Sequence, residues 1–306
     1  MDYVCVTTVE CNQGAVRAIR YNVDGNYCLS CGSDKKIKLW NPLKGLLLNT
    51  YAGHGNEVLD AASSCDNSQI ISCGADKTVI LWDVVKAQPL RRLRGHAGKV
   101  TSVVFNEEST AVISGSYDNT VMCWDVKSRQ NTPIQVLKDA TDCVTKVKVT
   151  DHEILTSSLD CRIRRYDIRA GELIEDYIGE PVSSISYTSD EQCILASSTD
   201  ETIKLLDKNS GELLGEYSGH KTGDYYIESC VDHTDSFIFS GSTDGAIWCW
   251  DLVKMIPVNQ LIHSNKSVVH SLSSHASTGS IISASGSNFK VWSNSSSLEN
   301  ENESET

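Results

Sequence analysis

The chain has 306 residues, 40% of them hydrophobic, and a formal net charge of -13 at neutral pH. No stretch approaches the ~18 consecutive apolar residues of a membrane helix, so the composition predicts no membrane segment. The acidic balance disfavours nonspecific nucleic-acid binding, which depends on clustered Lys and Arg, and leaves only local contact open.

The first predicted element is a strand over residues 3–9. The sequence MDYVCVTTVECNQ that contains it has no basic segment followed by an apolar run, so we expect no secretory or mitochondrial leader and a place in the cytoplasm and nucleus. After this strand, bulky residues recur every 40 to 44 positions to the end of the chain, at Trp40, Trp82, Trp124, Tyr166, Leu206, Trp250 and Trp292. A sustained period of this length indicates a repeat architecture rather than two ordinary domains.

Each repeat has the pattern of four short strands. In the third repeat, QPLRRL, KVTSVVF, AVISGS and TVMCWD alternate apolar and polar residues, and polar turns separate them. The sequence therefore predicts one all-β domain over residues 1–292, with repeats ending near the seven bulky residues. Residues 293–306 are rich in Ser, Asn and Glu and predict a disordered acidic tail.

Three repeats share a set of His, Ser, Asp and Trp at matched spacing: His54, Ser72, Asp76 and Trp82; His96, Ser114, Asp118 and Trp124; His220, Ser240, Asp244 and Trp250. Ser, His and Asp can form an acyl-transfer triad. They can equally form a structural chain in which indole, hydroxyl, imidazole and carboxylate hydrogen-bond in turn. Because an enzyme needs one triad and a stabilising network is useful in every repeat, we favour the structural interpretation and expect no catalytic residues.

The fourth repeat has no histidine at the expected place, and the fifth has Ala196 and Leu206 in place of the Ser and Trp. We expect these two units to depend on apolar packing and to be the softer part of the array.

The Gly-His pairs, the turn aspartates and the endings LWD, CWD and CWD resemble the WD-repeat family over residues 3–292. This resemblance implies a seven-bladed WD-repeat β-propeller. Since an open array leaves an unpaired edge at each end, we predict that the N-terminal strand closes the ring as the outermost strand of the last blade.

Cys28 and Cys31 form a CxxC sequence, which raises the possibility of a metal or redox site. Residues three apart on a strand point to opposite faces, so the interpretation as structural thiols is preferred. No metal site and no cofactor are predicted.

Candidate binding residues lie in the loops that lead into the first strands and in the Asp turns, because loops vary without disturbing the blades. These rim candidates are Arg17, Glu57, Lys99, Tyr117, Tyr225 and Tyr226. The two adjacent tyrosines occupy a longer loop and suit a partner contact, although one of them could instead pack beneath the loop. Arginine clusters at 91–94 and 162–169 could grip an acidic partner, but the sequence favours a solvated face for both.

We expect a noncatalytic scaffold that is monomeric within larger complexes. Stretches such as 13–45 and 205–221 are similar to a scaffold branch of the family that organises mitogen-activated protein kinases and is also found among spliceosomal proteins. That resemblance implies kinase-cascade components and spliceosomal proteins as partners and a role in pre-mRNA splicing. The alternatives are a subunit of an RNA-processing complex alone or an enzyme that uses the axial channel. An enzyme would need a cluster of carboxylates or histidines in the first strands, and these strands contain mainly Val, Ala, Ser and Thr.

Overall fold

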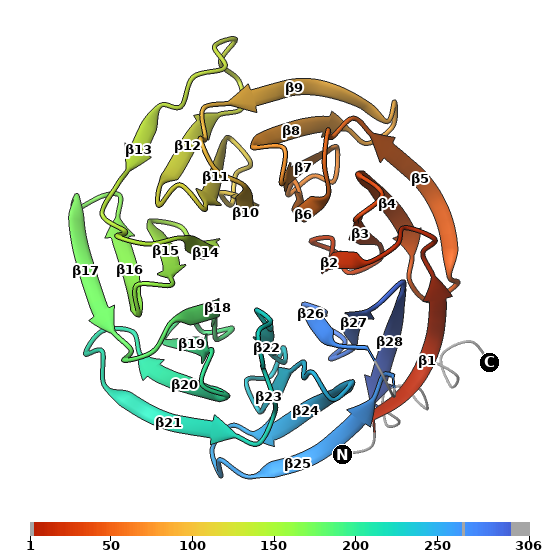
Figure 1. Ribbon diagram of the computed structural model, residues 1–306, viewed down its shortest axis with the longest axis vertical. Coiled ribbons are helices and arrows are strands. Elements are labelled where there is room, and N and C mark those ends of the chain that lie inside the picture. The colour runs from red at the N-terminus through yellow and green to blue at the C-terminus, as the bar shows by residue number, and fades with distance from the viewer. Residues whose placement is uncertain (1–2, 265–266, 295–306) are drawn as a thin grey trace.

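A computed structural model describes residues 3–264 and 267–294. Its strands form seven antiparallel four-stranded sheets, arranged as blades around a central axis (Figure 1). The described residues contain no helix, and the predicted seven-bladed β-propeller is confirmed.

The first four blades follow the chain in order, each from its innermost to its outermost strand. Blade 1 contains β2 (Val16–Tyr21), β3 (Cys28–Gly32), β4 (Lys36–Asn41) and β5 (Leu46–Ala52). Blade 2 contains β6 (Val58–Ser63), β7 (Gln69–Gly74), β8 (Thr78–Asp83) and β9 (Gln88–Arg94). Blade 3 contains β10 (Val100–Phe105), β11 (Ala111–Ser116), β12 (Val121–Asp125) and β13 (Gln135–Leu137). Blade 4 contains β14 (Val144–Val149), β15 (Glu153–Ser158), β16 (Arg162–Asp167) and β17 (Glu172–Tyr177).

The last three blades complete the ring. Blade 5 contains β18 (Val182–Tyr187), β19 (Cys193–Ser198), β20 (Thr202–Asp207) and β21 (Leu213–Ser218). Blade 6 contains β22 (Ser229–Val231), β23 (Phe237–Ser240), β24 (Ala246–Asp251) and β25 (Pro257–Ile262). Blade 7 contains β26 (Val269–Ser274), β27 (Ile281–Ser285), β28 (Asn288–Asn294) and the N-terminal strand β1 (Tyr3–Glu10).

The turn aspartates fix the sharp turn between the second and third strands of their blades. In blade 2 the Asp76 carboxylate accepts the backbone N–H of Thr78 at 3.2 Å, and Lys77 between them adopts a φ of 65°. The equivalent turn of blade 3 has a φ of 64° at Asn119. Because such left-handed backbone is unfavourable for side chains other than Gly, the aspartate bond offsets the strain of a turn that the blade needs.

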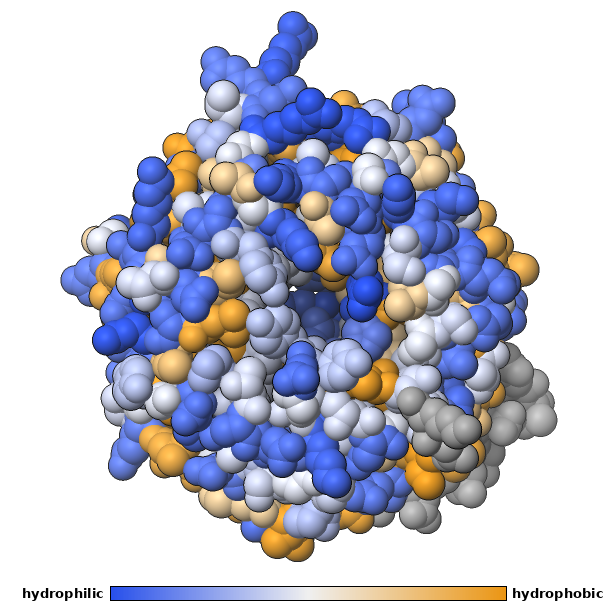
Figure 2. Space-filling view, viewed as in Figure 1, coloured by the Kyte–Doolittle hydropathy of each residue, from blue (hydrophilic) through white to orange (hydrophobic). Residues whose placement is uncertain are grey.

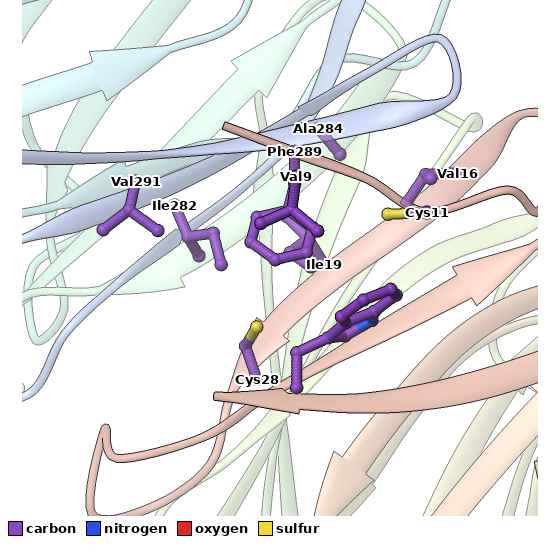
Figure 3. Close-up of a cluster of buried hydrophobic side chains, with 10 residues drawn as sticks. Val9, Cys11, Val16, Ile19, Cys28, Ile282, Ala284, Phe289 and Val291 are labelled. Atoms are coloured by element: carbon purple, nitrogen blue, oxygen red, sulfur yellow. The ribbon is translucent and has the colours of Figure 1, made fainter. Parts of the chain in front are cut away.

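Strand β1 closes the ring, as predicted. It pairs antiparallel with β28, with Tyr3 opposite Asn294 and Val9 opposite Phe289. Figure 3 shows the core between the first and last blades, where Val9 and Phe289 meet Ile19 and Cys28. The first and last described strands therefore share one sheet, in which β1 covers the edge of β28.

The domain boundaries differ slightly from the prediction. Strand β28 continues to Asn294, two residues past the predicted end at Trp292. It continues because Ser293 and Asn294 still pair with Val4 and Tyr3 of β1. Of the predicted acidic tail, residues 295–306 lie outside the described residues.

Cys28 and Cys31 are buried as free thiols in β3. Burial raises the pKa of the Cys28 thiol well above its ordinary value. Figure 3 shows Cys28 among apolar side chains, where it packs as a small apolar group.

Candidate functional site: the rim and the axial channel

Blades 2 and 3 each contain a complete chain of hydrogen bonds from Trp to Asp. In blade 2, Trp82 Nε1 donates to Ser72 Oγ at 2.8 Å, and that hydroxyl lies 2.8 Å from His54 Nε2. His54 Nδ1 lies 3.0 Å from the Asp76 carboxylate. Since a carboxylate only accepts, the Nδ1 proton is donated to Asp76 and the Ser72 hydroxyl donates to Nε2.

Blade 3 repeats this arrangement. Trp124 Nε1 donates to Ser114 Oγ at 2.9 Å, and His96 lies 2.8 Å from Ser114 and 3.0 Å from Asp118. Burial alone would raise the pKa of Asp118, but the Thr120 hydroxyl and His96 lower it to about 2. These polar side chains hydrogen-bond to one another within the blade, as expected for a structural network.

The expected chain does not form in blade 6. Neither ring nitrogen of His220 has a hydrogen-bond partner among the described residues. Ser240 Oγ donates to the Gly241 carbonyl, and Trp250 Nε1 donates to the Ser218 carbonyl at 3.1 Å. The sequence-based assignment of this network to His220, Ser240, Asp244 and Trp250 is therefore wrong.

A second tryptophan explains the difference in blade 6. Trp248 stacks on Trp250 with ring centroids 5.9 Å apart, and its indole N–H donates to the Asp244 carboxylate at 3.3 Å. The span from His220 to Ser240 is also two residues longer than that from His96 to Ser114. The longer loop and the competing indole leave His220 packed edge-on against Trp250 instead.

Blades 1 and 7 contain equivalent chains that the sequence pattern missed. In blade 1, Ser30 accepts from Trp40 Nε1 at 2.8 Å and donates to Gln13, whose amide reaches Asp34 at 3.4 Å. Glutamine substitutes for histidine because its amide both accepts and donates. Gln13 is followed by a glycine, as His54 is, and this could have indicated the equivalence. The sequence pattern required a Gly-His pair, however, and therefore missed the glutamine.

In blade 7, His263 lies 2.6 Å from Ser283 and 2.9 Å from the Asn288 side-chain oxygen, and Trp292 donates to Ser283 at 2.8 Å. Asn288 takes the place of the missing turn aspartate from a position two residues after Gly286. The complete chains therefore occupy four consecutive blades, 7, 1, 2 and 3.

The structure places the six rim candidates in two groups. Arg17 and Glu57 form an ion pair of 2.9 Å between blades 1 and 2. Lys99 Nζ lies 5.9 Å from the centre of the Tyr117 ring, a cation–π contact within blade 3.

The two adjacent tyrosines lie in the loop that leads into blade 6. The Tyr226 side chain lies close to Tyr117, and burial, followed by this neighbouring phenol, raises the pKa of the Tyr117 phenol. Blades 3 and 6 are not neighbours (Figure 1), so this contact crosses one end of the axial channel. Tyr117, Tyr225 and Tyr226 are nevertheless 40%, 53% and 44% exposed and form an aromatic group, hereafter the tyrosine rim.

The two arginine clusters are mostly occupied by contacts within the molecule. Arg91 donates to the backbone carbonyls of Asp125 and Val126, both at 2.9 Å. Arg164 is buried between Asp160 and Glu175, each at 2.7 Å. These guanidinium groups therefore stabilise neighbouring strands and loops rather than present a free basic surface.

The axial channel contains charged side chains that sequence reasoning missed. Figure 2 shows the central opening, with hydrophilic residues in its depth. Arg20 of blade 1 lies 2.9 Å from Asp60 of blade 2, and Lys146 of blade 4 lies 2.9 Å from the same carboxylate. Lys146 also lies 2.7 Å from Glu228 of blade 6, to which Arg20 donates at 2.7 Å. We call Arg20, Asp60, Lys146 and Glu228 the channel lattice.

Serines extend the channel lattice to two further blades. Ser102 of blade 3 donates to Asp60 at 3.1 Å, and Ser271 of blade 7 donates to Glu228 at 2.7 Å. Burial alone would raise the pKa of Glu228, but Arg20 and Lys146 hold it well below its ordinary value. The carboxylates are therefore ionised, fully engaged and unsuited to act as a general acid or base.

The expectation that the first strands carry mainly small and apolar residues is thus incomplete. The four lattice residues lie at least 40 positions apart in sequence, and only the ring brings them together. The available signal was a charged residue in the first strand, or directly before it, in blades 1, 2, 4 and 6, with Arg20 two register positions further along its strand than Asp60 and Lys146.

One group among the described residues has donor atoms close enough for a metal. His152, Glu153 and Asp167 place one ligand atom each within 4.8 Å of one another. Glu153 is already paired with Lys208 at 2.7 Å, so one of the three donors is occupied. No described helix is long and apolar enough to cross a membrane.

Comparison with known proteins matches the family model described as WD domain, G-beta repeat. The matched residues are 3–41, 45–83, 87–125, 171–207 and 211–251, more than half of the chain. Blades 4 and 7 lie largely outside these ranges.

Full-length relatives carry related names. WD repeat domain-containing protein 83 of Xenopus tropicalis is 63% identical over 284 residues, which cover 93% of this chain and 90% of the relative. The human protein of that name is 53% identical over 290 residues, with the same coverage of both chains. A homologue in Dictyostelium discoideum is 37% identical over 320 residues, covering 94% of this chain and 97% of the relative.

Proposed function

Because the chain belongs to the WD-repeat family, we propose that it is a noncatalytic scaffold whose tyrosine rim binds partner proteins. The observation that carries this proposal is the tyrosine rim itself, three part-exposed tyrosines brought to one end of the channel from blades 3 and 6. Tyrosine supplies a large, stiff contact surface with a polar tip, and it is enriched at the energetic centres of protein interfaces.

The rest of the molecule fits a scaffold better than an enzyme. The Ser, His and Asp side chains of blades 2 and 3 hydrogen-bond within their own blades, and the channel carboxylates are held by Arg20 and Lys146. Repeated networks stabilise a rigid disc, on which loops can hold several proteins at once.

As partners, we propose components of the extracellular-signal-regulated kinase cascade and proteins of the spliceosome. We propose that the protein binds them in the cytoplasm and in the nucleus. The support is the resemblance of the loop sequences to the scaffold branch described above. The net charge of -13 favours contact with spliceosomal proteins over direct contact with RNA.

Affinity capture from cells tests the tyrosine rim. The test variant is Tyr225→Ala/Tyr226→Ala, and the matched control is Tyr27→Ala/Tyr177→Ala, which removes exposed tyrosines from a β2–β3 loop and an outer strand. We expect the test variant to lose a defined set of proteins and the control to retain it, with the same melting transition for both.

The identity of the lost proteins separates the two roles. Loss of kinases and splicing proteins together supports the dual scaffold, whereas loss of splicing proteins alone supports a subunit of an RNA-processing complex. An unchanged set of captured proteins in the test variant would reject the tyrosine rim as the binding surface.

A further inference from the structure

Lys148 lies in the axial channel, and its ammonium group forms no ion pair with the carboxylates of the channel lattice. It lies on β14, two residues beyond Lys146 and therefore farther from the tyrosine rim. Within the described part of the chain, its ammonium group forms no hydrogen bond and no ion pair. An ammonium group has three protons to donate and no capacity to accept, so it requires oxygen acceptors from elsewhere.

Two hydroxyl groups occupy the same level of the channel. Lys148 pairs with Leu155, Ser186 with Leu195 and Ser273 with Ile282, which are equivalent register positions in blades 4, 5 and 7. Side chains at equivalent positions of the inner strands point the same way, toward the axis.

Both hydroxyls have a proton to donate. The Ser186 oxygen is buried and has no hydrogen-bond partner among the described residues. Ser273 Oγ accepts the backbone N–H of Tyr21 at 3.2 Å, and its own proton is given to no described acceptor. This level of the channel therefore has donors and lacks a matching acceptor.

Lys148, Ser186 and Ser273 line one cavity of about 190 Å³. Its charged lining consists of Arg20, Lys146, Lys148 and Glu228, three cations and one carboxylate. Asp60, next to this cavity, pairs with Arg20 and Lys146, so the positive charge of Lys148 remains unbalanced. Glu107 and Lys148 both line an adjoining cavity, but no ion pair joins them among the described residues.

We propose that this cavity binds a small free oxyanion of the phosphate class, held by the Lys148 ammonium and the Ser186 and Ser273 hydroxyls. Lysine binds phosphate as a point charge, and charge-assisted hydrogen bonds are the strong ones. The cavity exceeds the roughly 30 Å³ that one water occupies in the liquid. Lys146 and Glu228 of the channel lattice line this cavity on the side of the tyrosine rim.

The electrostatic environment of Lys148 favours the binding of an anion. Burial, and then the neighbouring charges of Lys146 and Arg20, lower the pKa of Lys148 to about 8. Asp60 and Glu228 oppose this change only in part, because each is already paired with Arg20 and Lys146. A bound anion would supply the missing counter-charge.

Isothermal titration of the purified full-length protein with inorganic phosphate, at constant ionic strength set with chloride, tests the site. We expect saturable binding to the wild type and at least tenfold weaker binding to Lys148→Met, which keeps the length of the side chain without its charge. The control is Lys44→Met, an exposed lysine of the β4–β5 turn, and it should bind as the wild type does.

Two further measurements make the result independent of one variant. Ser186→Ala/Ser273→Ala should weaken phosphate binding and leave Lys148 in place. Phosphate should also raise the melting temperature of the wild type more than that of Lys148→Met, since a ligand of the folded state stabilises it. Titration with acetate in place of phosphate shows whether a carboxylate can occupy the same site.

Equal phosphate binding by the wild type and Lys148→Met would overturn the proposal, as would the absence of binding to the wild type. Stronger binding of acetate than of phosphate would overturn the assignment to the phosphate class. None of these results bears on the tyrosine rim, whose test is protein capture.

Discussion

At the residue scale, the same four residue types produce different structures in different blades. Ser72 connects Trp82 to His54, whereas Ser240 donates only to the neighbouring backbone. The identity of a residue in a repeat pattern is therefore a weaker guide than the partners that its loop length allows.

This contrast gives a direct prediction for two equivalent serines. Ser72→Ala removes the acceptor of the buried Trp82 indole and a partner of His54, so it should lower the free energy of unfolding by about 1–3 kcal/mol. Ser240→Ala breaks neither kind of contact and should cost less than about 1 kcal/mol. Urea unfolding of the two variants measures both effects, and equal costs would contradict the assigned networks.

Buried histidines give a second prediction, for the dependence of stability on pH. Burial lowers the pKa of His220 to about 4, although Asp200 and Asp244 oppose it, and burial lowers the pKa of His263 to about 4 as well. In the unfolded chain each takes up a proton near pH 6.5, whereas in the folded protein each stays neutral until about pH 4. Stability is therefore lost as the pH falls from 6.5 to 4, by about 1.4 kcal/mol per pH unit for each histidine.

His220→Asn should make the loss smaller by the contribution of one histidine, about 1.4 kcal/mol per pH unit, because it removes one of the buried titrating groups. Unfolding measured between pH 6.5 and 5 tests this, since carboxylates such as Asp118, with a pKa of about 2, contribute only at lower pH. Burial also lowers the pKa of His96, His270 and His275, but these histidines are present in both proteins and do not affect the difference between them. An unchanged slope in the variant would show that His220 is not the titrating group.

At the element scale, the strands follow from the sequence and the polar networks follow only in part. Alternating apolar and polar residues recur in every blade, and the turn aspartates recur in all but the last. Together they predicted four strands per repeat. Gln13 and Asn288 escaped prediction because a hydrogen-bond chain needs a donor and an acceptor at the right place, not a particular residue type. The channel lattice escaped because its four members meet only after the ring has closed.

Strand β1 is the element on which closure depends. Tyr3 packs edge-on against Phe239 and donates to the Gly279 carbonyl at 3.0 Å, and Val9 lies in the core between blades 7 and 1. Deletion of residues 1–10 exposes the edge of β28 and removes this packing, so cooperative thermal unfolding should be lost.

Calorimetry of this deletion, beside a deletion of residues 295–306 as control, checks the role of β1. The control should melt as the full chain does, because its deleted residues contain one leucine among polar residues and no part of any described strand. An unchanged melting transition without residues 1–10 would rule out closure by β1.

At the scale of the whole molecule, the ring has two unlike ends, and ion pairs cross its central channel. The tyrosine rim occupies one end, the channel lattice joins blades across the axis, and the Lys148 cavity adjoins the lattice. Complete hydrogen-bond chains stabilise blades 7, 1, 2 and 3, while blades 4 to 6 use ion pairs and apolar packing. Binding of partner proteins is thus assigned to loops that the repeat pattern leaves free to vary.

The central claim, that the tyrosine rim is where partner proteins bind, can be tested by site-specific photo-crosslinking in cells. A photoreactive amino acid at position 225 should crosslink the same proteins that Tyr225→Ala/Tyr226→Ala fails to capture. The same amino acid at position 27, an exposed site in the β2–β3 loop, should not crosslink them. Crosslinks to those proteins from position 27 but not from position 225 would contradict the claim.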